Sequence, residues 1–295
     1  MTIFEGSAVA LVLPMFDNGD IDFEGFKRQV QRMIDGGVQA LLVNGTTGET
    51  ATITIEDEFK LLDMTMELAK GTGVKVICGA GSNDTQTALK KARYAKEKGA
   101  DAILVVTPYY NKTSQRGLIA HYTAIHDATN LPIILYNVPS RTGVNIKPET
   151  AAELAKLPRV NGIKEASGDL DQVAKIHELC GDELNIWSGN DDQIFDILER
   201  GGKGVISVLS NIAPKETHEI VASYLNGDKK TSKELMDKYV KLAKAMFVDV
   251  NPIPVKEAVS LIGFNAGPLR LPLIEMDESN KKYVKETMEE YGLVK

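Results

Sequence analysis

Cysteine is scarce in this sequence, and its two copies lie far apart. Cys78 and Cys180 are the only cysteines in 295 residues, and they form no C-x-x-C pair. Disulfide frameworks and zinc sites need several cysteines at short spacings, so neither is expected. Such a composition is typical of a reducing compartment, and we expect a cytoplasmic protein.

Excess positive charge and long apolar runs are also missing. The chain has a formal net charge of −7 at pH 7, and its basic pairs, Lys229-Lys230 and Lys281-Lys282, stand in acidic surroundings. An acidic protein without a basic patch does not attract nucleic acid or anionic membranes. The N-terminus lacks the basic region of a signal peptide, and every apolar run falls short of the roughly 18 residues that a membrane span needs. We therefore expect small-molecule partners, with neither nucleic acid nor a membrane among them.

Short apolar, β-branched runs bounded by glycine, proline or asparagine recur along the chain and predict strands. There are eight of these runs: Ala8–Pro14, Ala40–Gly45, Val74–Gly81, Ala102–Pro108, Pro132–Val138, Val160–Ser167, Asn185–Asp191 and Gly204–Ser210. Segments with helical periodicity lie between them, such as Phe23–Asp35, Glu56–Lys70 and Thr85–Lys98. Because successive parallel strands need a crossover, this alternation predicts an α/β fold of the (β/α)8 TIM barrel type. A doubly wound open sheet is the alternative, but no G-x-G-x-x-G follows the first strand.

The C-terminal quarter contains helical periodicity without a further strand run. A helix over Pro214–Leu225 is expected to complete the barrel, and Asn226-Gly227-Asp228 is typical of a turn. Helical segments follow near Lys230–Val248, Val255–Ile262 and Asp277–Tyr291. We therefore predict a catalytic barrel over residues 1–225 and a C-terminal helical extension over residues 226–295.

Polar residues gather where the predicted strands end, which is where TIM barrels carry their active sites. The relevant stretches are Asn44-Gly45-Thr46-Thr47-Gly48-Glu49, Thr107-Pro108-Tyr109-Tyr110-Asn111, Tyr136 to Gly143, Lys164-Glu165 and Ser188-Gly189-Asn190-Asp191. Thr46 with Glu49 fits a capping box, although the same glycine-flanked turn could also bind a carboxylate. Tyr136 fits a core aromatic and Tyr110 a surface one, but each also fits a site residue. Arg141 is either a solvated loop residue or a carboxylate ligand.

Lys164 is the residue whose position most needs an explanation. At the carboxyl end of a buried strand it is either a salt-bridged lysine or an amine nucleophile, because a lysine in a low-dielectric pocket loses its proton more easily. Its neighbour Glu165 is expected to point away from it into the helix layer, since adjacent strand residues face opposite sides.

Metal and phosphate chemistry find little support in the sequence. The four histidines, His121, His126, His177 and His218, fall in helical segments rather than at strand ends. The loops after the last two strands lack the glycine-rich grip that often binds phosphate in barrels. We therefore expect no metal site, and a phosphorylated substrate is disfavoured.

Taken together, these stretches resemble the dihydrodipicolinate synthase family of the pyruvate-dependent class I aldolases. The resemblance rests on the order and spacing of Gly45-Thr46-Thr47-Gly48-Glu49, Tyr109-Tyr110-Asn111, Tyr136 to Gly143 and Gly162-Ile163-Lys164-Glu165, and it runs from about Phe4 to Leu273. It also covers Asn251-Pro252-Ile253-Pro254-Val255-Lys256 and Leu269 to Leu273.

The resemblance implies a lyase that condenses pyruvate with L-aspartate 4-semialdehyde in the diaminopimelate route of lysine biosynthesis. By this resemblance Lys164 forms the Schiff base and Tyr136 relays protons, linked through Thr46 to a Tyr110 that comes from a neighbouring subunit. Substrate contacts are assigned, again by resemblance, to Thr47, Arg141, Gly189 and Ile206. It further implies a homotetramer built from tight dimers and a reaction that requires neither a metal nor an organic cofactor.

Two alternatives remain open on the sequence. One is a sibling aldolase acting on N-acetylneuraminate or a 2-keto-3-deoxy sugar acid, although Thr46 and Arg141 favour the synthase. The other is a barrel that binds a keto acid without turnover. The family members that lysine inhibits tend to carry histidines and a glutamate where this chain has Ile55, Glu58 and Thr87, so we expect weak or absent lysine inhibition.

Overall fold

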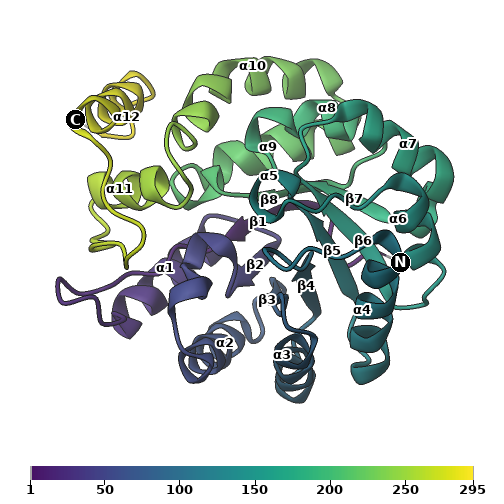
Figure 1. The fold of residues 1–295 in the computed structure, drawn as a ribbon. Helices are drawn as coiled ribbons and strands as arrows, with labels where there is room; N and C mark the ends of the chain where they lie inside the picture. The colour runs from purple at the N-terminus through teal and green to yellow at the C-terminus, as the bar shows by residue number, and fades with distance from the viewer. Residues whose placement is uncertain (1, 295) are drawn as a thin grey trace.

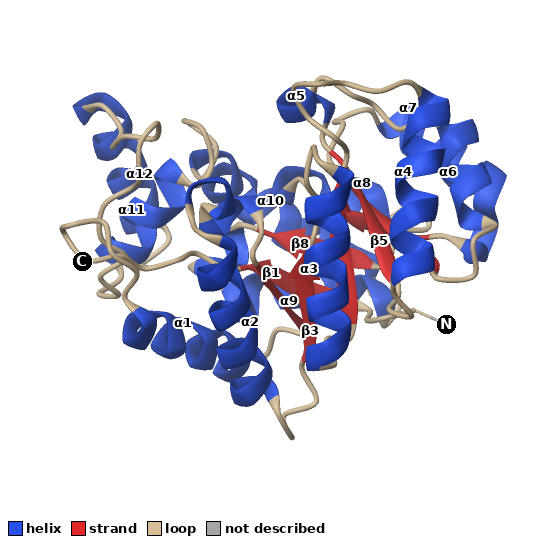
Figure 2. Cartoon of the chain, turned by 60° about the horizontal axis from the view of Figure 1, so that its bottom comes forward, coloured by secondary structure: helices blue, strands red, loops and turns tan. Residues whose placement is uncertain are grey.

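A closed barrel of parallel strands forms the centre of the molecule. In the computed structural model, which describes residues 2–294, strands β1 to β8 pair in chain order and β8 pairs with β1. Figure 1 shows the helices arranged around the barrel, and Figure 2 shows the strands enclosed by them in a second view. The predicted (β/α)8 barrel is confirmed. Met1 and Lys295, the outer limits of the two predicted segments, lie outside the described residues.

The elements follow the predicted alternation. The strands are β1 (Gly6–Ala10), β2 (Ala40–Val43), β3 (Lys75–Gly79), β4 (Ala102–Val106), β5 (Ile133–Asn137), β6 (Val160–Glu165), β7 (Asn185–Ser188) and β8 (Gly204–Ser207). The barrel helices are α1 (Phe23–Asp35), α2 (Ile55–Ala69), α3 (Thr85–Lys98), α4 (Gln115–Ala128), α5 (Pro139–Thr142), α6 (Pro148–Ala155), α7 (Leu170–Cys180), α8 (Ile194–Leu198) and α9 (Pro214–Leu225).

Local sequence explains where several helices begin. The side chains of Thr54, Asp84, Ser114 and Asp169 accept hydrogen bonds from first-turn N–H groups of α2, α3, α4 and α7. These caps satisfy donors that a helix cannot pair internally. Each cap thereby fixes the residue at which its helix begins after the preceding strand.

The barrel has two apolar layers. Inward side chains, including Ala8, Leu42, Ile134 and Ile206, form a buried cluster inside the barrel. Phe4 stacks on Trp187 within this cluster, with ring centroids 5.0 Å apart. Outward strand residues pack against the helices in a second, larger cluster. The interior is therefore a packed core, and space for a ligand must lie beyond the strand ends.

The C-terminal helices are α10 (Lys229–Ala245), α11 (Ile253–Leu261) and α12 (Glu278–Glu290), and Figure 1 shows α11 and α12 at one side of the barrel. Their buried residues form one apolar cluster with Val12, Val208 and Leu209 of the barrel loops. The predicted helical extension is therefore present, while its boundary at residues 225 and 226 stays a prediction. Within residues 2–294, none of the helices has the length and apolar character needed to cross a membrane.

Candidate active site

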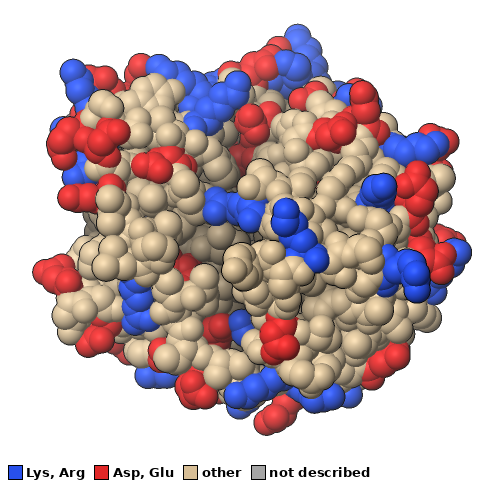
Figure 3. Space-filling view, in the orientation of Figure 1, with Lys and Arg blue, Asp and Glu red and all other residues tan. Residues whose placement is uncertain are grey.

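A cavity of about 200 Å³ opens at the carboxyl ends of the barrel strands. Most of the residues predicted for the site line it, namely Thr46, Thr47, Tyr136, Arg141, Lys164 and Gly189. The space-filling view in Figure 3 shows a hollow near the middle of this face, with basic side chains beside it. The sequence argument therefore identified the correct end of the barrel.

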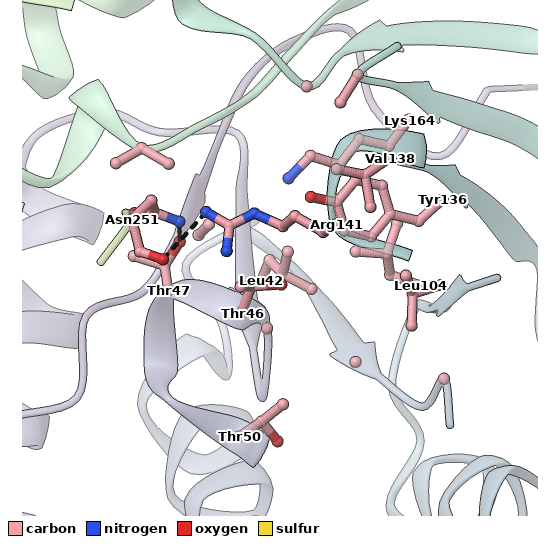
Figure 4. Close-up of a pocket in the computed structure, with 18 of the residues that line it drawn as sticks. Leu42, Thr46, Thr47, Thr50, Leu104, Tyr136, Val138, Arg141, Lys164 and Asn251 are labelled. Carbon is pink, nitrogen blue, oxygen red and sulfur yellow. Dashed lines mark hydrogen bonds between the residues drawn. The ribbon is translucent and has the colours of Figure 1, made fainter. Parts of the chain in front are cut away.

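Lys164 and Tyr136 stand side by side on neighbouring strands. They are register partners of β6 and β5, and aligned residues of parallel strands face the same side of a sheet. The Lys164 Nζ atom lies 4.6 Å from the centre of the Tyr136 ring, and Figure 4 shows the amine and the phenol hydroxyl directed into the same space. Glu165 points the other way and accepts hydrogen bonds from Asn137 Nδ2 and Ser167 N. The predicted orientation of Glu165 is confirmed.

Gly189 makes room for the lysine. Its backbone N–H donates to the carbonyl of Glu165, which brings the end of β7 against the end of β6. A Cβ atom at this position would lie 2.7 Å from Ala166 Cβ and 3.1 Å from Lys164 Cε. A side chain here would clash with Ala166 and crowd Lys164, so the close approach requires glycine.

Burial lowers the pKa of the Lys164 amine to about 8. Loss of hydration is the largest cause; the Asp191 carboxylate opposes it, and the Arg141 guanidinium adds to it. Asp191 is itself buried and accepts hydrogen bonds from the backbone N–H groups of Val208 and Leu209, at 2.9 and 3.0 Å. At neutral pH Lys164 is therefore unprotonated and nucleophilic far more often than a lysine of ordinary pKa.

The turn after β2 brings two threonines to the cavity. In the described chain the short helix η1 (Thr46–Gly48) has no side-chain cap, so the predicted capping box is wrong. The Glu49 carboxylate instead pairs with Lys256 of α11, 2.6 Å away. The spacing of Thr46 and Glu49 is that of a capping box, but the Glu49 carboxylate is bound by Lys256 instead. Burial raises the pKa of the Tyr136 phenol, while the Arg141 charge and the nearby Thr46 side chain oppose that rise; the link from Tyr136 through Thr46 to Tyr110 stays a prediction.

Arg141 and Thr47 are held by one residue of the C-terminal segment, Asn251. The Arg141 guanidinium donates to the Asn251 carbonyl, and the Asn251 side-chain amide donates to the Thr47 hydroxyl, both at 3.1 Å (Figure 4). Asn251 also lines the cavity. The guanidinium is exposed but lines the cavity opposite Lys164, which favours the carboxylate-binding interpretation of Arg141.

Asn251, Lys256 and Asp191 are residues for which the sequence analysis gave no role. Asp191 stood at the end of a strand run, so its position was a usable signal. Asn251 and Lys256 had no comparable local signal, because their partners Thr47 and Glu49 lie more than 200 residues earlier in the chain.

Two residues expected at the site are not brought to the cavity within residues 2–294. Tyr110 is 91% exposed on the loop after β4, with a φ of 70°. The Ile206 side chain is buried in the barrel interior and is not among the residues that line the cavity, so its backbone contact with substrate stays a prediction. It comes two residues before Val208, which does line the cavity, and a strand rises about 3.3 Å per residue, so Ile206 lies one layer deeper.

Metal-binding clusters were sought among the same residues. No group of three or more His, Cys, Asp or Glu side chains within residues 2–294 is arranged to hold a metal ion. The histidines lie in α4, α7 and α9 as predicted, and His121 and His126 are buried there.

Comparisons with known proteins agree with this geometry. The model of the dihydrodipicolinate synthetase family matches residues 3–291. A 4-hydroxy-tetrahydrodipicolinate synthase of Clostridium perfringens is 50% identical over 293 residues, covering 99% of this chain and 100% of the relative. The crystal structure of dihydrodipicolinate synthase from Thermotoga maritima superposes with a TM-score of 0.96 at 46% identity, covering 99% of this chain and 100% of the other. The lysine-bound enzyme of Cyanidioschyzon merolae gives 0.97 at 36% identity and covers both chains fully.

Proposed function

Because the chain belongs to the dihydrodipicolinate synthetase family, we propose that it condenses pyruvate with L-aspartate 4-semialdehyde to give 4-hydroxy-tetrahydrodipicolinate, in lysine biosynthesis. The observation that carries the proposal is that the Lys164 amine lies beside the Tyr136 side chain in a cavity at the barrel mouth. Burial lowers the pKa of this amine to about 8. An amine nucleophile of this kind forms a Schiff base with a ketone.

Pyruvate is bound and activated first. The neutral Lys164 amine attacks the ketone carbon, and loss of water gives an iminium on Nζ. The turn at Thr47 receives the carboxylate of pyruvate through its hydroxyl and backbone. The Tyr136 hydroxyl, which lies near Thr46, passes the protons that leave and join during these steps. Because burial raises the pKa of Tyr136, its hydroxyl keeps its proton at neutral pH and acts as a donor.

The aldehyde is bound second. The iminium draws electrons from the methyl group, which loses a proton to become an enamine carbon, and this carbon bonds to the aldehyde carbon of the semialdehyde. The substrate's own amino group then displaces Lys164 and closes the ring. Arg141, fixed by the Asn251 carbonyl, binds the carboxylate of the semialdehyde. Because Gly189 has no side chain, it leaves room for the Lys164 side chain. The scheme requires neither a metal nor an organic cofactor.

The proposal is tested by reducing the enzyme with borohydride in the presence of pyruvate. We expect a pyruvyl adduct on each chain, mapped by peptide mass to Lys164, because only an imine is trapped in this way. Samples without pyruvate, or with pyruvate but no borohydride, should keep the unmodified mass. Turnover with aspartate semialdehyde, without release of pyruvate from N-acetylneuraminate, then distinguishes the synthase from a sibling aldolase. An adduct on another lysine would overturn the proposed mechanism.

We further propose that the enzyme is a homo-oligomer, a tetramer of tight dimers in which Tyr110 completes the site of a neighbouring subunit. Its support is the 91% exposed Tyr110 ring on a backbone of positive φ, a conformation that bulky side chains rarely adopt. Thr46 is exposed in the single chain, which leaves its hydroxyl accessible to such a neighbour. Analytical ultracentrifugation at assay concentrations should show the oligomer, and a fully active monomer would contradict the role of Tyr110.

Lysine is expected to inhibit this enzyme weakly or not at all. The Glu58 carboxylate is engaged by Lys91 at 2.7 Å, the Thr87 hydroxyl donates to Asp84, and Ile55 offers no polar group. These side chains are therefore not available to bind the charged groups of an amino acid. Steady-state assays over a range of lysine concentrations measure the effect, and half-inhibition at submillimolar lysine would refute the expectation.

A further inference from the structure

A buried ion pair joins the turn after β2 to the C-terminal segment. Lys256 Nζ lies 2.6 Å from Glu49 Oε1, and the two side chains are 2% and 1% exposed. The second carboxylate oxygen of Glu49 accepts the backbone N–H of Arg270 at 2.9 Å, and Lys256 also donates to the carbonyl of Pro268. Both oxygens of Glu49 are therefore bound by a part of the chain that begins more than 200 residues later.

Glu49 sits where the turn needs an external hold. The short helix Thr46–Gly48 is flanked by Asn44 and Glu49, two non-glycine residues with φ of 58° and 51°. This left-handed conformation is unfavourable for such residues and persists only where surrounding contacts fix it. The carboxylate bonds of Glu49 provide that fixation at the end of the turn.

The same C-terminal segment reaches the substrate side of the turn. Asn251, five residues before Lys256, donates to the Thr47 hydroxyl and accepts from Arg141. The side chain of Arg270 donates to the carbonyl of Thr52, just beyond Glu49. Residues of the segment from 251 to 270 thus hold the turn at its middle residue, Thr47, and beyond its C-terminal end, at Glu49 and Thr52.

We propose that the Glu49–Lys256 ion pair positions the Thr46–Gly48 turn for the carboxylate of pyruvate, so that the C-terminal extension sets the enzyme's affinity for its first substrate. The inference rests on the proposed function, because it takes pyruvate as the ligand of this turn. Neither Glu49 nor Lys256 contacts the reacting atoms in this assignment; they are positioning residues.

The structure offers a matched buried pair for comparison. Lys91 of α3 and Glu58 of α2 are 2.7 Å apart with side chains 10% and 4% exposed. This pair joins two barrel helices and has no bond to the Thr46–Gly48 turn through its charged groups. If Lys256 were merely structural, removing either lysine would have the same kind of effect, a loss of thermal stability alone.

The test compares the variants Lys256→Met and Lys91→Met with the wild type. The pyruvate concentration that gives half-maximal borohydride trapping at Lys164 is measured together with kcat and the thermal midpoint. We expect Lys256→Met to raise the half-saturating concentration by about tenfold, since a small displacement of a substrate-positioning group weakens binding strongly. Its kcat at saturating pyruvate should stay within about threefold, because the reacting groups are intact. Lys91→Met should lower the thermal midpoint and leave the half-saturating concentration within about twofold.

Two further variants complete the experiment. In Glu49→Gln with Lys256→Met no buried charge is left unpaired, so part of the thermal midpoint should return, while the half-saturating pyruvate concentration should stay raised because the ion pair that holds the turn is absent. Should Lys256→Met fail to fold, Glu49→Gln alone serves, with an expected rise of about threefold. A folded Lys256→Met with unchanged half-saturation, or an equal shift in Lys91→Met, overturns the inference. Absence of any adduct in the wild type would instead overturn the proposed function.

Discussion

Replacing Lys164 with cysteine is expected to lower kcat/KM for pyruvate by about 10⁴-fold or more, because a thiol forms no imine with a ketone. Lys164 is the amine that borders the Tyr136 ring in the cavity, and the other lysine that lies close to the site, Lys256, is held by Glu49 and Pro268. Steady-state kinetics and the borohydride adduct measure the loss together. Activity close to that of the wild type would mean that Lys164 does not form the Schiff base.

The same variant allows the amine to be rebuilt chemically. Alkylation with 2-bromoethylamine yields a side chain of the same length as lysine, with sulfur in place of Cγ, and activity should return to within about 100-fold of the wild type. The two natural cysteines are poor competitors for the reagent, because both are buried and burial raises the pKa of the Cys78 thiol to about 12. Wild-type enzyme treated identically is the control. Complete alkylation at position 164 of a folded variant without recovery would contradict the Schiff-base role.

The pH profile of the wild type gives the same prediction an independent check. Burial lowers the pKa of Lys164 to about 8, so the amine is protonated and unreactive below this pH. The value of kcat/KM for pyruvate should accordingly rise about tenfold per pH unit up to about pH 8 and then level off. A profile that still rises steeply towards pH 10 would mean that the lysine keeps the ordinary pKa of an exposed amine.

The sequence predicted the barrel well because its strands are buried on both faces. Such strands appear as short apolar runs between glycines and prolines, and their order along the chain is their order around the barrel. The ends of the runs were less reliable. The first run was expected over Ala8–Pro14, but β1 ends at Ala10, and Val12 packs instead with the C-terminal helices. An apolar run reports burial, and burial does not distinguish a strand from the loop that follows it.

The candidate site was predictable to the extent that it depends on strand ends. Lys164 and Tyr136 lie near the ends of buried runs and Arg141 follows one, and the barrel geometry brings them to one mouth. Their supports were not predictable, because the partners of Asn251 and Lys256 are more than 200 residues away in the chain. The capping-box interpretation of Glu49 failed for this reason: a local pattern competed with a long-range ion pair that no spacing reveals.

Replacing Tyr136 with phenylalanine is expected to lower kcat by about 10²- to 10³-fold while the half-saturating pyruvate concentration changes by less than about fivefold. Phenylalanine keeps the ring beside the Lys164 amine and removes the hydroxyl, which is the group that passes protons in the proposed scheme. The borohydride adduct should still form, but more slowly. Stopped-flow measurement of imine formation and steady-state turnover separate these two effects.

A matched control is available in Tyr122, a buried tyrosine of α4 whose hydroxyl donates to the carbonyl of Val105 at 3.0 Å. Tyr122→Phe loses a buried hydrogen bond too, so its free energy of unfolding should fall by about 1 kcal/mol while kcat stays that of the wild type. The kcat of Thr46→Val should lie between those of the two tyrosine variants, about tenfold below the wild type. Tyr136 keeps its hydroxyl in this variant but loses the neighbouring hydroxyl of Thr46. Equal kcat values for Tyr136→Phe and Tyr122→Phe would show that the Tyr136 hydroxyl only supports the fold. Another group would then have to transfer protons to and from the substrate bound at Lys164.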